Sequence, residues 1–179
     1  MTAEPLIASP LASGRDVIYT HTLTEGPAEQ SRKGLDMTRQ EVEELFARRL
    51  EALARRDSAA LAMLFSADGV IESPTAGGTV HGRRAIEEVY RAWFTAFPDV
   101  TFSSEEALLI DGDRVAQRLM SSGTDTGGFL NLPPTGKAFR VPLVLLCTLA
   151  DNKIVHERRI YDFTGMLIQI GVLKAKPGQ

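Results

Sequence analysis

Residues 139–161, FRVPLVLLCTLADNKIVHERRIY, indicate the fold of this chain most directly. It contains two runs rich in apolar, β-branched and aromatic residues, 139–149 and 153–161, separated by the turn-forming pair Asp151-Asn152. Runs of this composition on either side of such a pair are typical of an antiparallel β-hairpin. The sequence therefore predicts two long neighbouring strands near the end of the chain.

The same signal occurs once more towards the N-terminus. The runs 100–110 and 114–123 flank Asp111-Gly112, which is a common hairpin turn. A brief strand is expected at 70–73, and the segment 162–173 is expected to close the fold. The second half of the chain is thus predicted to be a meander of antiparallel strands.

Before this meander, apolar residues recur at helical spacing. Thr38 and Glu41 have the spacing of a capping box, in which each side chain accepts a hydrogen bond from a free backbone N–H. Helices followed by a meander predict an α+β fold, with three N-terminal helices packed on one face of a strongly curved antiparallel sheet. The three helices are expected over residues 38–53, 58–65 and 84–97.

Apolar residues in the run 139–149 fall on both faces of the predicted strand. Leu143, Leu145 and Cys147 share one face, and Val144 and Leu146 share the other. One layer of helices covers only one face of a sheet, so the second face needs another cover. We therefore expect a homodimer through the convex face, with Leu143, Leu145 and Cys147 covered by the second subunit.

The chain has 179 residues, which is enough for one domain with its own core. Residues 1–36 are mostly polar and are punctuated by Pro and Gly. We expect them to form an N-terminal arm that is flexible or docks on a partner subunit. Residues 37–179 are expected to form a single domain.

Composition excludes several functions. The net charge is −3 and no basic cluster exceeds two residues, which argues against nucleic-acid binding. No run approaches the ~18 apolar residues of a membrane span, and the first residues lack the features of a signal peptide, so a cytoplasmic location is expected. The three histidines lack metal-ligand spacing and no Gly-rich dinucleotide turn follows a strand, so neither metal nor cofactor is expected.

Residues 48–74 resemble the opening of the nuclear-transport-factor-like cone fold, as in ketosteroid isomerase. Further on, the chain resembles the SnoaL-like polyketide cyclase family more closely. This resemblance implies a cone-shaped pocket between the curved sheet and the helices, usually in a dimer. The residues that carry it are His81-Gly82, Trp93 with Phe97-Pro98-Asp99, the segments 123–127 and 134–137, and Ile154 to Asp162 leading to Gln169-Ile170-Gly171.

The chemistry of the related enzymes matches less well than the fold. The positions of the ketosteroid isomerase Tyr and Asp base carry Arg49 and Ser73, so that isomerisation is not supported. Limonene-epoxide hydrolase, on the same fold, uses an Arg-x-Asp pair and a further Asp, and only Asp125 matches, because Arg159 takes the place of the last acid. SnoaL-like cyclases usually carry His where this chain has Asp125.

Asp125 and Glu157 are the candidate catalytic residues. Asp125 is either the general acid or base, because a carboxylate in a dry pocket has its pKa raised towards neutrality, or a turn residue that caps its hairpin. Period two places Glu157, Arg159 and Tyr161 on one strand face, which the resemblance to ketosteroid isomerase places inside the cone. Arg159 would then pair with Glu157 and hold a substrate oxygen, unless this face is simply charged and solvated.

Further candidates for substrate binding lie on the helices and the first long strand of the hairpin. Arg49 falls on an apolar helical stripe and is either a snorkelling side chain or a cation aimed into the pocket. Tyr90 and Trp93 are either core residues or stack on a planar substrate. Arg140 shares strand phase with Val144 and is expected to face inward. The complete substrate-binding set is Arg49, Ser73, Tyr90, Trp93, Arg140, Arg159 and Tyr161.

The sequence is best interpreted as a SnoaL-like enzyme that cyclises or isomerises a small, apolar, oxygenated metabolite without a cofactor. Asp125 would move the proton, and Arg159 or Arg49 would stabilise the developing oxyanion. One alternative is an epoxide or lactone hydrolase in which Asp125 and Glu157 activate water. Another is a non-catalytic ligand-binding or accessory module that forms dimers.

Overall fold

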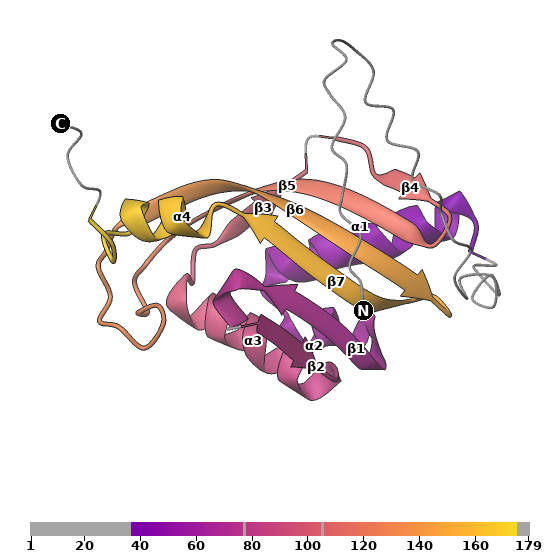
Figure 1. Cartoon of the computed structure of the whole chain (residues 1–179), viewed down its shortest axis with the longest axis horizontal. Helices are drawn as coiled ribbons and strands as arrows, with labels where there is room; N and C mark the ends of the chain where they lie inside the picture. The colour runs from indigo at the N-terminus through magenta and orange to yellow at the C-terminus, as the bar shows by residue number, and fades with distance from the viewer. Residues whose placement is uncertain (1–36, 77, 105, 175–179) are drawn as a thin grey trace, which may run out of the picture. The chain divides into compact units, whose positions relative to one another are not determined.

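A computed structural model describes residues 37–76, 78–104 and 106–174 of the chain (Figure 1). The predicted arm, residues 1–36, lies outside the described residues. The described part contains four α-helices, one short 3₁₀ turn (η2, Pro74–Ala76) and a seven-stranded sheet.

Three helices precede most of the sheet, as predicted. They are α1 (Arg39–Arg55), α2 (Ser58–Met63) and α3 (Arg83–Ala96). The capping box at the start of α1 is confirmed: the Thr38 hydroxyl accepts the Glu41 backbone N–H at 3.3 Å, and the Glu41 carboxylate accepts the Thr38 backbone N–H at 2.6 Å. A fourth short helix, α4 (Phe163–Gln169), closes the fold where a closing segment was expected.

The sheet has the strand order β2-β1-β7-β6-β5-β3, with β4 paired to β5. The predicted hairpin over 139–149 and 153–161 is present as β6–β7. The other predicted hairpin is present at its turn as β4–β5, but its first strand, expected over 100–110, is divided into two short strands, β3 and β4, which both pair with β5. The strands are β1 (Phe65–Ser73), β2 (Gly78–His81), β3 (Thr101–Ser103), β4 (Leu109–Asp111), β5 (Arg114–Thr124), β6 (Ala138–Ala150) and β7 (Lys153–Tyr161).

The prediction of a wholly antiparallel sheet is wrong at one pair. Strands β1 and β7 run parallel, with Ile71 opposite Glu157. Parallel neighbours need a long crossover connection, and the chain between β1 and β7 supplies it, including α3. This pairing matters for the site because it brings the end of β1 beside the last strand.

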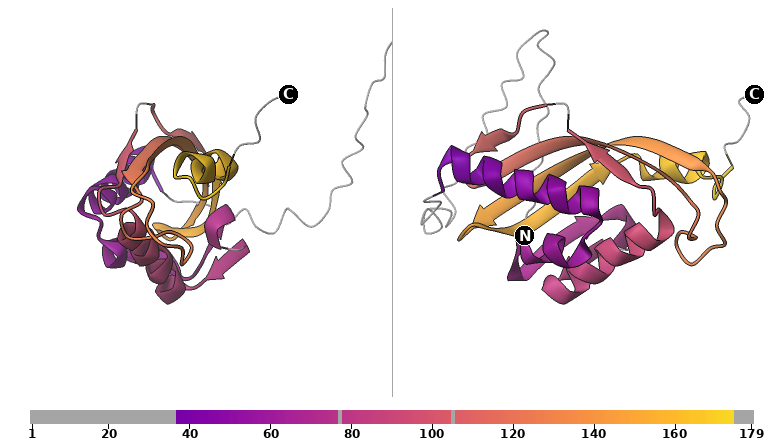
Figure 2. Two further views of the ribbon diagram at one scale, coloured as in Figure 1. Left: turned by 90° about the vertical axis from the view of Figure 1, so that its left-hand side faces the viewer. Right: turned by 180° about the vertical axis from the view of Figure 1, so that it is seen from behind.

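The sheet curls around the side on which α1, α2 and α3 lie (Figure 2). Its concave face packs on α1 and α3 through a core that includes Phe46, Leu53 and Ile86. A second cluster, which contains Phe97, Phe129 and the α4 residue Met166, fills the end of the molecule near α4. The helices and the curved sheet therefore enclose the interior from opposite sides.

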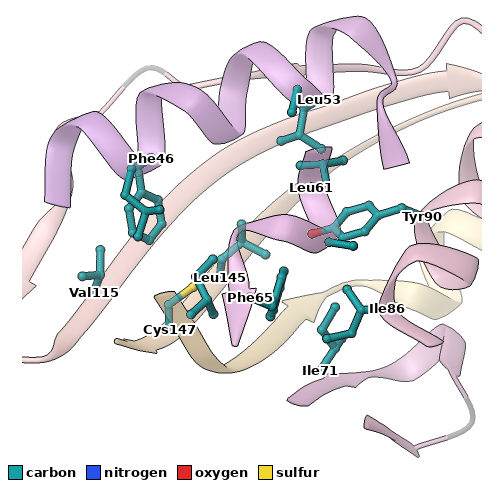
Figure 3. Packing of buried hydrophobic residues seen from close by; sticks show 14 of the residues in the cluster. Phe46, Leu53, Leu61, Phe65, Ile71, Ile86, Tyr90, Val115, Leu145 and Cys147 are labelled. Carbon is teal, nitrogen blue, oxygen red and sulfur yellow. The ribbon is translucent and has the colours of Figure 1, made fainter. Parts of the chain in front are cut away.

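The dimer prediction assumed that the odd-numbered residues of β6 face away from the helices, and this assumption is wrong. Leu143, Leu145 and Cys147 face the interior, where at most 9% of each residue is exposed. Figure 3 shows Leu145 and Cys147 among the buried residues of the core. These residues are covered by the chain's own helices, so their predicted burial against a second subunit is wrong. Val144 and Leu146 occupy the outer face, and Leu146 is 40% exposed.

Candidate active site

A cavity of about 40 Å³ lies between α1, α3 and the inner face of the sheet. By the volume that one buried water needs, it holds roughly three water-sized groups. Much of its wall is apolar, and its polar groups come from α1, α3 and four strands or turns. The lining residues are Arg49, Leu53, Ser73, Thr75, Tyr90, Trp93, Phe102, Leu119, Ser121, Val141, Leu143, Leu145, Arg159 and Tyr161.

Two arginines meet one carboxylate beside this cavity. Arg49 Nη1 of α1 lies 2.5 Å from Glu157 Oε2, and Arg159 Nε lies 2.7 Å from Glu157 Oε1. Both Arg49 and Glu157 are buried, with 2% and 0% of the residue exposed. The predicted Glu157–Arg159 pair is therefore confirmed, and Arg49 is a cation of the pocket rather than a snorkelling side chain.

Two neutral residues complete this cluster. Arg49 Nη2 donates a hydrogen bond to the Tyr90 hydroxyl at 3.0 Å, and the Arg159 guanidinium lies over the Tyr90 ring, 4.7 Å from its centroid. The Cys147 thiol, directly opposite Glu157 on β6, donates to its carboxylate at 3.9 Å. Guanidinium stacking on an aromatic face adds a cation–π attraction.

The charge states follow from burial and from these pairs. Burial alone would raise the pKa of Glu157, but the two guanidinium groups outweigh it and lower the pKa to about 2. Burial raises the pKa of the Cys147 thiol to about 12 and also raises the pKa of Tyr90. At neutral pH the cluster thus holds two cations, one carboxylate and two neutral groups, which leaves one excess positive charge.

Three hydroxyl groups form a second polar element of the wall. The Tyr161 hydroxyl donates to Thr75 Oγ1 at 3.1 Å, and Thr75 Oγ1 lies 2.9 Å from Ser73 Oγ. Ser73 ends β1 and Tyr161 ends β7, so the parallel pairing of these strands brings the chain of hydroxyls together. This arrangement provides a short route for a proton along the wall.

Asp125 does not line the cavity, although it is 0% exposed. Its carboxylate accepts hydrogen bonds from the Gly128 backbone N–H at 3.2 Å and from the Thr135 N–H and hydroxyl, both at 3.0 Å. The expectation that Asp125 lies in the pocket is wrong, because these donors of the β5–β6 connection hold it in the loop. The alternative interpretation, a turn residue, describes its contacts.

Arg140 does not reach the cavity either. It is exposed on the outer face of β6, in the same phase as Val144. The prediction that it faces inward is wrong, because the odd-numbered residues of β6 face the interior and the even-numbered residues, including Arg140, face outward. The remaining candidates Ser73, Tyr90, Trp93 and Tyr161 do line the cavity, and Glu157 lies directly behind Arg49 and Arg159.

The sequence interpretation missed Thr75 and Ser121. Ser121 shares the inner phase of β5 with the buried residues Val115 and Leu119, and only 2% of it is exposed. A polar residue in an apolar strand phase was the signal that could have revealed it. Thr75 follows Pro74 in a turn, where no periodic pattern indicates direction.

Comparison with known proteins gives the family. The pattern that defines SnoaL-like polyketide cyclases matches residues 43–170, and the chain therefore belongs to this family. Among curated proteins, no significant match is found.

Solved structures agree on the fold. A protein with a ketosteroid isomerase-like fold from Catenulispora acidiphila is 23% identical, with a TM-score of 0.62 over 72% of this chain and 92% of that chain. IdmH from Streptomyces antibioticus, a proposed polyketide cyclase, is 29% identical, with a TM-score of 0.60 over 72% and 97% of the two chains. SalBIII, an epoxide hydrolase/cyclase-like enzyme with a role in pyran ring formation in salinomycin, is 26% identical, with a TM-score of 0.59 over 70% and 94%.

Within 37–76, 78–104 and 106–174, no helix is both long and apolar enough to span a membrane. The same ranges hold no group of three or more His, Cys, Asp or Glu side chains arranged to bind a metal ion.

Proposed function

We propose that the protein is a cyclase-like enzyme that cyclises or isomerises a small, largely apolar, oxygenated substrate through an enol or enolate. Membership of the SnoaL-like family supports a cyclase-like role. The observation that carries the proposal is Arg159, a cation on the cavity wall that Glu157 holds by a 2.7 Å ion pair. Given the size of the cavity, one oxygenated end of the substrate enters it.

Arg159 acts on the carbonyl oxygen of the substrate. When a proton leaves the neighbouring carbon, this oxygen gains negative charge, and a guanidinium in a largely apolar cavity stabilises that charge more strongly than water would. Glu157 and Arg49 orient Arg159 through their ion pairs. Glu157 is thus a positioning residue rather than the acid or base that the sequence suggested.

Ring closure needs a proton donor, and Tyr161 is the donor in the wall. The enolate carbon attacks a second carbonyl of the same substrate, a carbon–carbon bond forms, and the electron pair of that carbonyl moves to its oxygen. The new alkoxide takes the proton of the Tyr161 hydroxyl, and the tyrosinate regains a proton from water. A base of the buffer takes the α-proton, so the substrate loses one proton from carbon and gains one on oxygen. Thr75 accepts the hydrogen bond of the Tyr161 hydroxyl at 3.1 Å and holds it in the wall.

Deuterium exchange tests this proposal without knowledge of the natural substrate. Cyclopentanone exchanges its α-protons slowly in neutral D₂O, and proton NMR measures how far the protein accelerates the exchange. Arg159→Met should reduce the acceleration roughly 10²–10³-fold, the typical effect of removing one oxyanion donor. Arg158→Met is the matched control, because Arg158 lies next to it on β7 but pairs with Glu72 on the outer face. No acceleration by the wild-type protein would contradict enolate chemistry.

A ligand-binding module without catalysis is the second candidate. It is favoured by one observation: no Asp or Glu is among the described residues that line the cavity. Saturable binding of ligands with no exchange or turnover in the wild-type protein would identify this function.

We also propose that two copies of the chain associate through the outer face of the sheet. Leu146 and Ile160, which are 40% and 50% exposed, lie near each other on β6 and β7. Leu146→Glu should then yield monomers by light scattering, while a wild-type protein that is already monomeric would contradict the dimer. The cytoplasmic location stays a prediction from the sequence.

A further inference from the structure

Four buried polar atoms of residues that line the cavity have no hydrogen-bond partner among the described residues. They are Arg49 Nε on α1, Trp93 Nε1 on α3, Ser121 Oγ on β5 and Arg159 Nη2 on β7. All four belong to hydrogen-bond donors, and the indole N–H and the two guanidinium groups can only donate. Buried donors are normally paired, so four unpaired donors around one cavity indicate a ligand that accepts hydrogen bonds.

The charge of the wall defines this ligand further. Arg49 and Arg159 contribute two positive charges and Glu157 contributes one negative charge. The other titratable groups in contact with them, Tyr90 and Cys147, are neutral at pH 7 because burial raises the pKa of each. One positive charge is therefore uncompensated, and a buried charge is unfavourable unless an opposite charge pairs with it.

We propose that the cavity binds a singly charged anion with two oxygen atoms, either a carboxylate or the enolate of a 1,3-dicarbonyl compound. Its charge cancels the excess positive charge of the wall, and its two oxygens accept hydrogen bonds from the unpaired donors. A neutral carbonyl group would leave the charge uncompensated, and a dianion would exceed it. This inference rests on the proposed function for the enolate, and it extends that function by naming the ionisation state in which the substrate binds.

Binding of the anion also accounts for the lack of a carboxylate base. A 1,3-dicarbonyl compound releases a proton to the buffer when it forms its enolate, and the cavity then holds the anion. The protein lowers the pKa of the bound compound through Arg159, so no Asp or Glu in the wall is required.

Tryptophan fluorescence reports on this site directly, because Trp93 is the single tryptophan of the chain and lines the cavity. Titration with propionate is compared with titration with propionamide, which has the same shape and no charge. Propionate should change the fluorescence saturably and bind at least 10-fold more tightly than propionamide. For the enolate, pentane-2,4-dione is added at neutral pH, and the absorption difference between enolate and neutral forms is recorded.

Two substitutions locate the anion. Arg159→Met should abolish the propionate signal, whereas Arg158→Met on the outer face should preserve it. Because Arg159→Met leaves Glu157 with one partner and threatens folding, Ser121→Ala provides a milder variant, expected to weaken propionate binding several-fold with unchanged circular dichroism. Ser121→Ala removes one donor and no charge, so propionamide serves again as the uncharged reference.

The outcomes distinguish a carboxylate from an enolate as the bound anion. They also distinguish the anion site from the enolate chemistry of the proposed function. Binding of propionate alone assigns a carboxylate, enolate formation alone assigns a 1,3-dicarbonyl, and both support a general two-oxygen anion site. Equal affinity for propionate and propionamide without enolate formation, or equal losses in the Arg158 and Arg159 variants, would overturn the anion site. Anion binding without deuterium exchange would retain this inference and reject the enolate chemistry, while exchange without anion binding would do the reverse.

Discussion

Glu157 and Asp125 are both fully buried carboxylates, but they serve different regions of the molecule. Asp125 accepts hydrogen bonds from Gly128 and Thr135, neutral donors of the loop in which it lies. Glu157 bridges two guanidinium groups, one from its own strand and one from α1. Burial alone therefore does not show whether a carboxylate belongs to the site. The groups that pair with the carboxylate show this.

The two carboxylates differ in the charge of their partners and in the elements that they connect. The donors around Asp125 satisfy its oxygens without adding a cation, so its contacts stabilise only the β5–β6 loop. Around Glu157 the cations outnumber the carboxylate, which fixes α1 against β7 and leaves positive charge on the cavity wall. Substitutions at the two carboxylates should therefore differ in their effects on stability and on the cavity.

Glu157→Gln should produce the largest loss of stability. It leaves Arg49 and Arg159 buried without an opposite charge, and removal of one partner from a buried pair typically costs about 3–5 kcal/mol. The free energy of unfolding, measured with urea, checks this value. A loss as small as that of Asp125→Asn would show that the two carboxylates do not differ as described.

Acid should remove the contribution of Glu157 gradually. Its pKa is lowered in the folded state from 4.5 to about 2, so the stabilisation is complete above the unfolded value and is lost as pH falls from about 4.5 to about 2. This contribution is about 3 kcal/mol by linkage. Unfolding free energies between pH 5 and pH 2 should decline less steeply in Glu157→Gln than in the wild type. Parallel curves for the two proteins would contradict the assignment.

Asp125→Asn should have a smaller effect and a local one. The amide keeps one accepting oxygen but opposes the N–H donors of Gly128 and Thr135, which costs about 1–3 kcal/mol for the unsatisfied groups. Propionate binding and deuterium exchange should stay at wild-type levels, because Asp125 does not touch the cavity. A 10²-fold or greater loss of exchange in a folded variant would restore the acid–base role that the sequence suggested.

Glu72→Gln should have the smallest effect. Glu72 pairs with Arg158 at 2.6 Å and with His156 at 2.9 Å, but on the partly exposed outer face, where water screens such pairs. The melting temperature should change by no more than a few degrees. A drop comparable to that of Glu157→Gln would show that ion pairs on the outer face matter as much as the buried pair.

Much of the fold and part of the site were accessible from the sequence. The capping box at Thr38 and the turn pair Asp151-Asn152 predicted α1 and the β6–β7 hairpin, because both signals depend on neighbours within a few residues. Period two grouped Glu157, Arg159 and Tyr161 on one face of β7, and the structure shows Arg159 and Tyr161 on the cavity wall with Glu157 behind them. Strand periodicity thus predicted which residues share a face of β7.

Long-range packing determines which of these groups come into contact and which face of each strand lies inside. Strand β6 is apolar in both phases, so its sequence could not show that Leu145 faces the core while Val144 and Arg140 face outward. The placement of Asp125 in its own loop depended on Thr135, across an irregular connection without periodicity. The Arg49–Glu157 contact joins α1 to the last strand, and such a long-range pair depends on how the helix packs against the curved sheet. Local spacing carries no information about that packing.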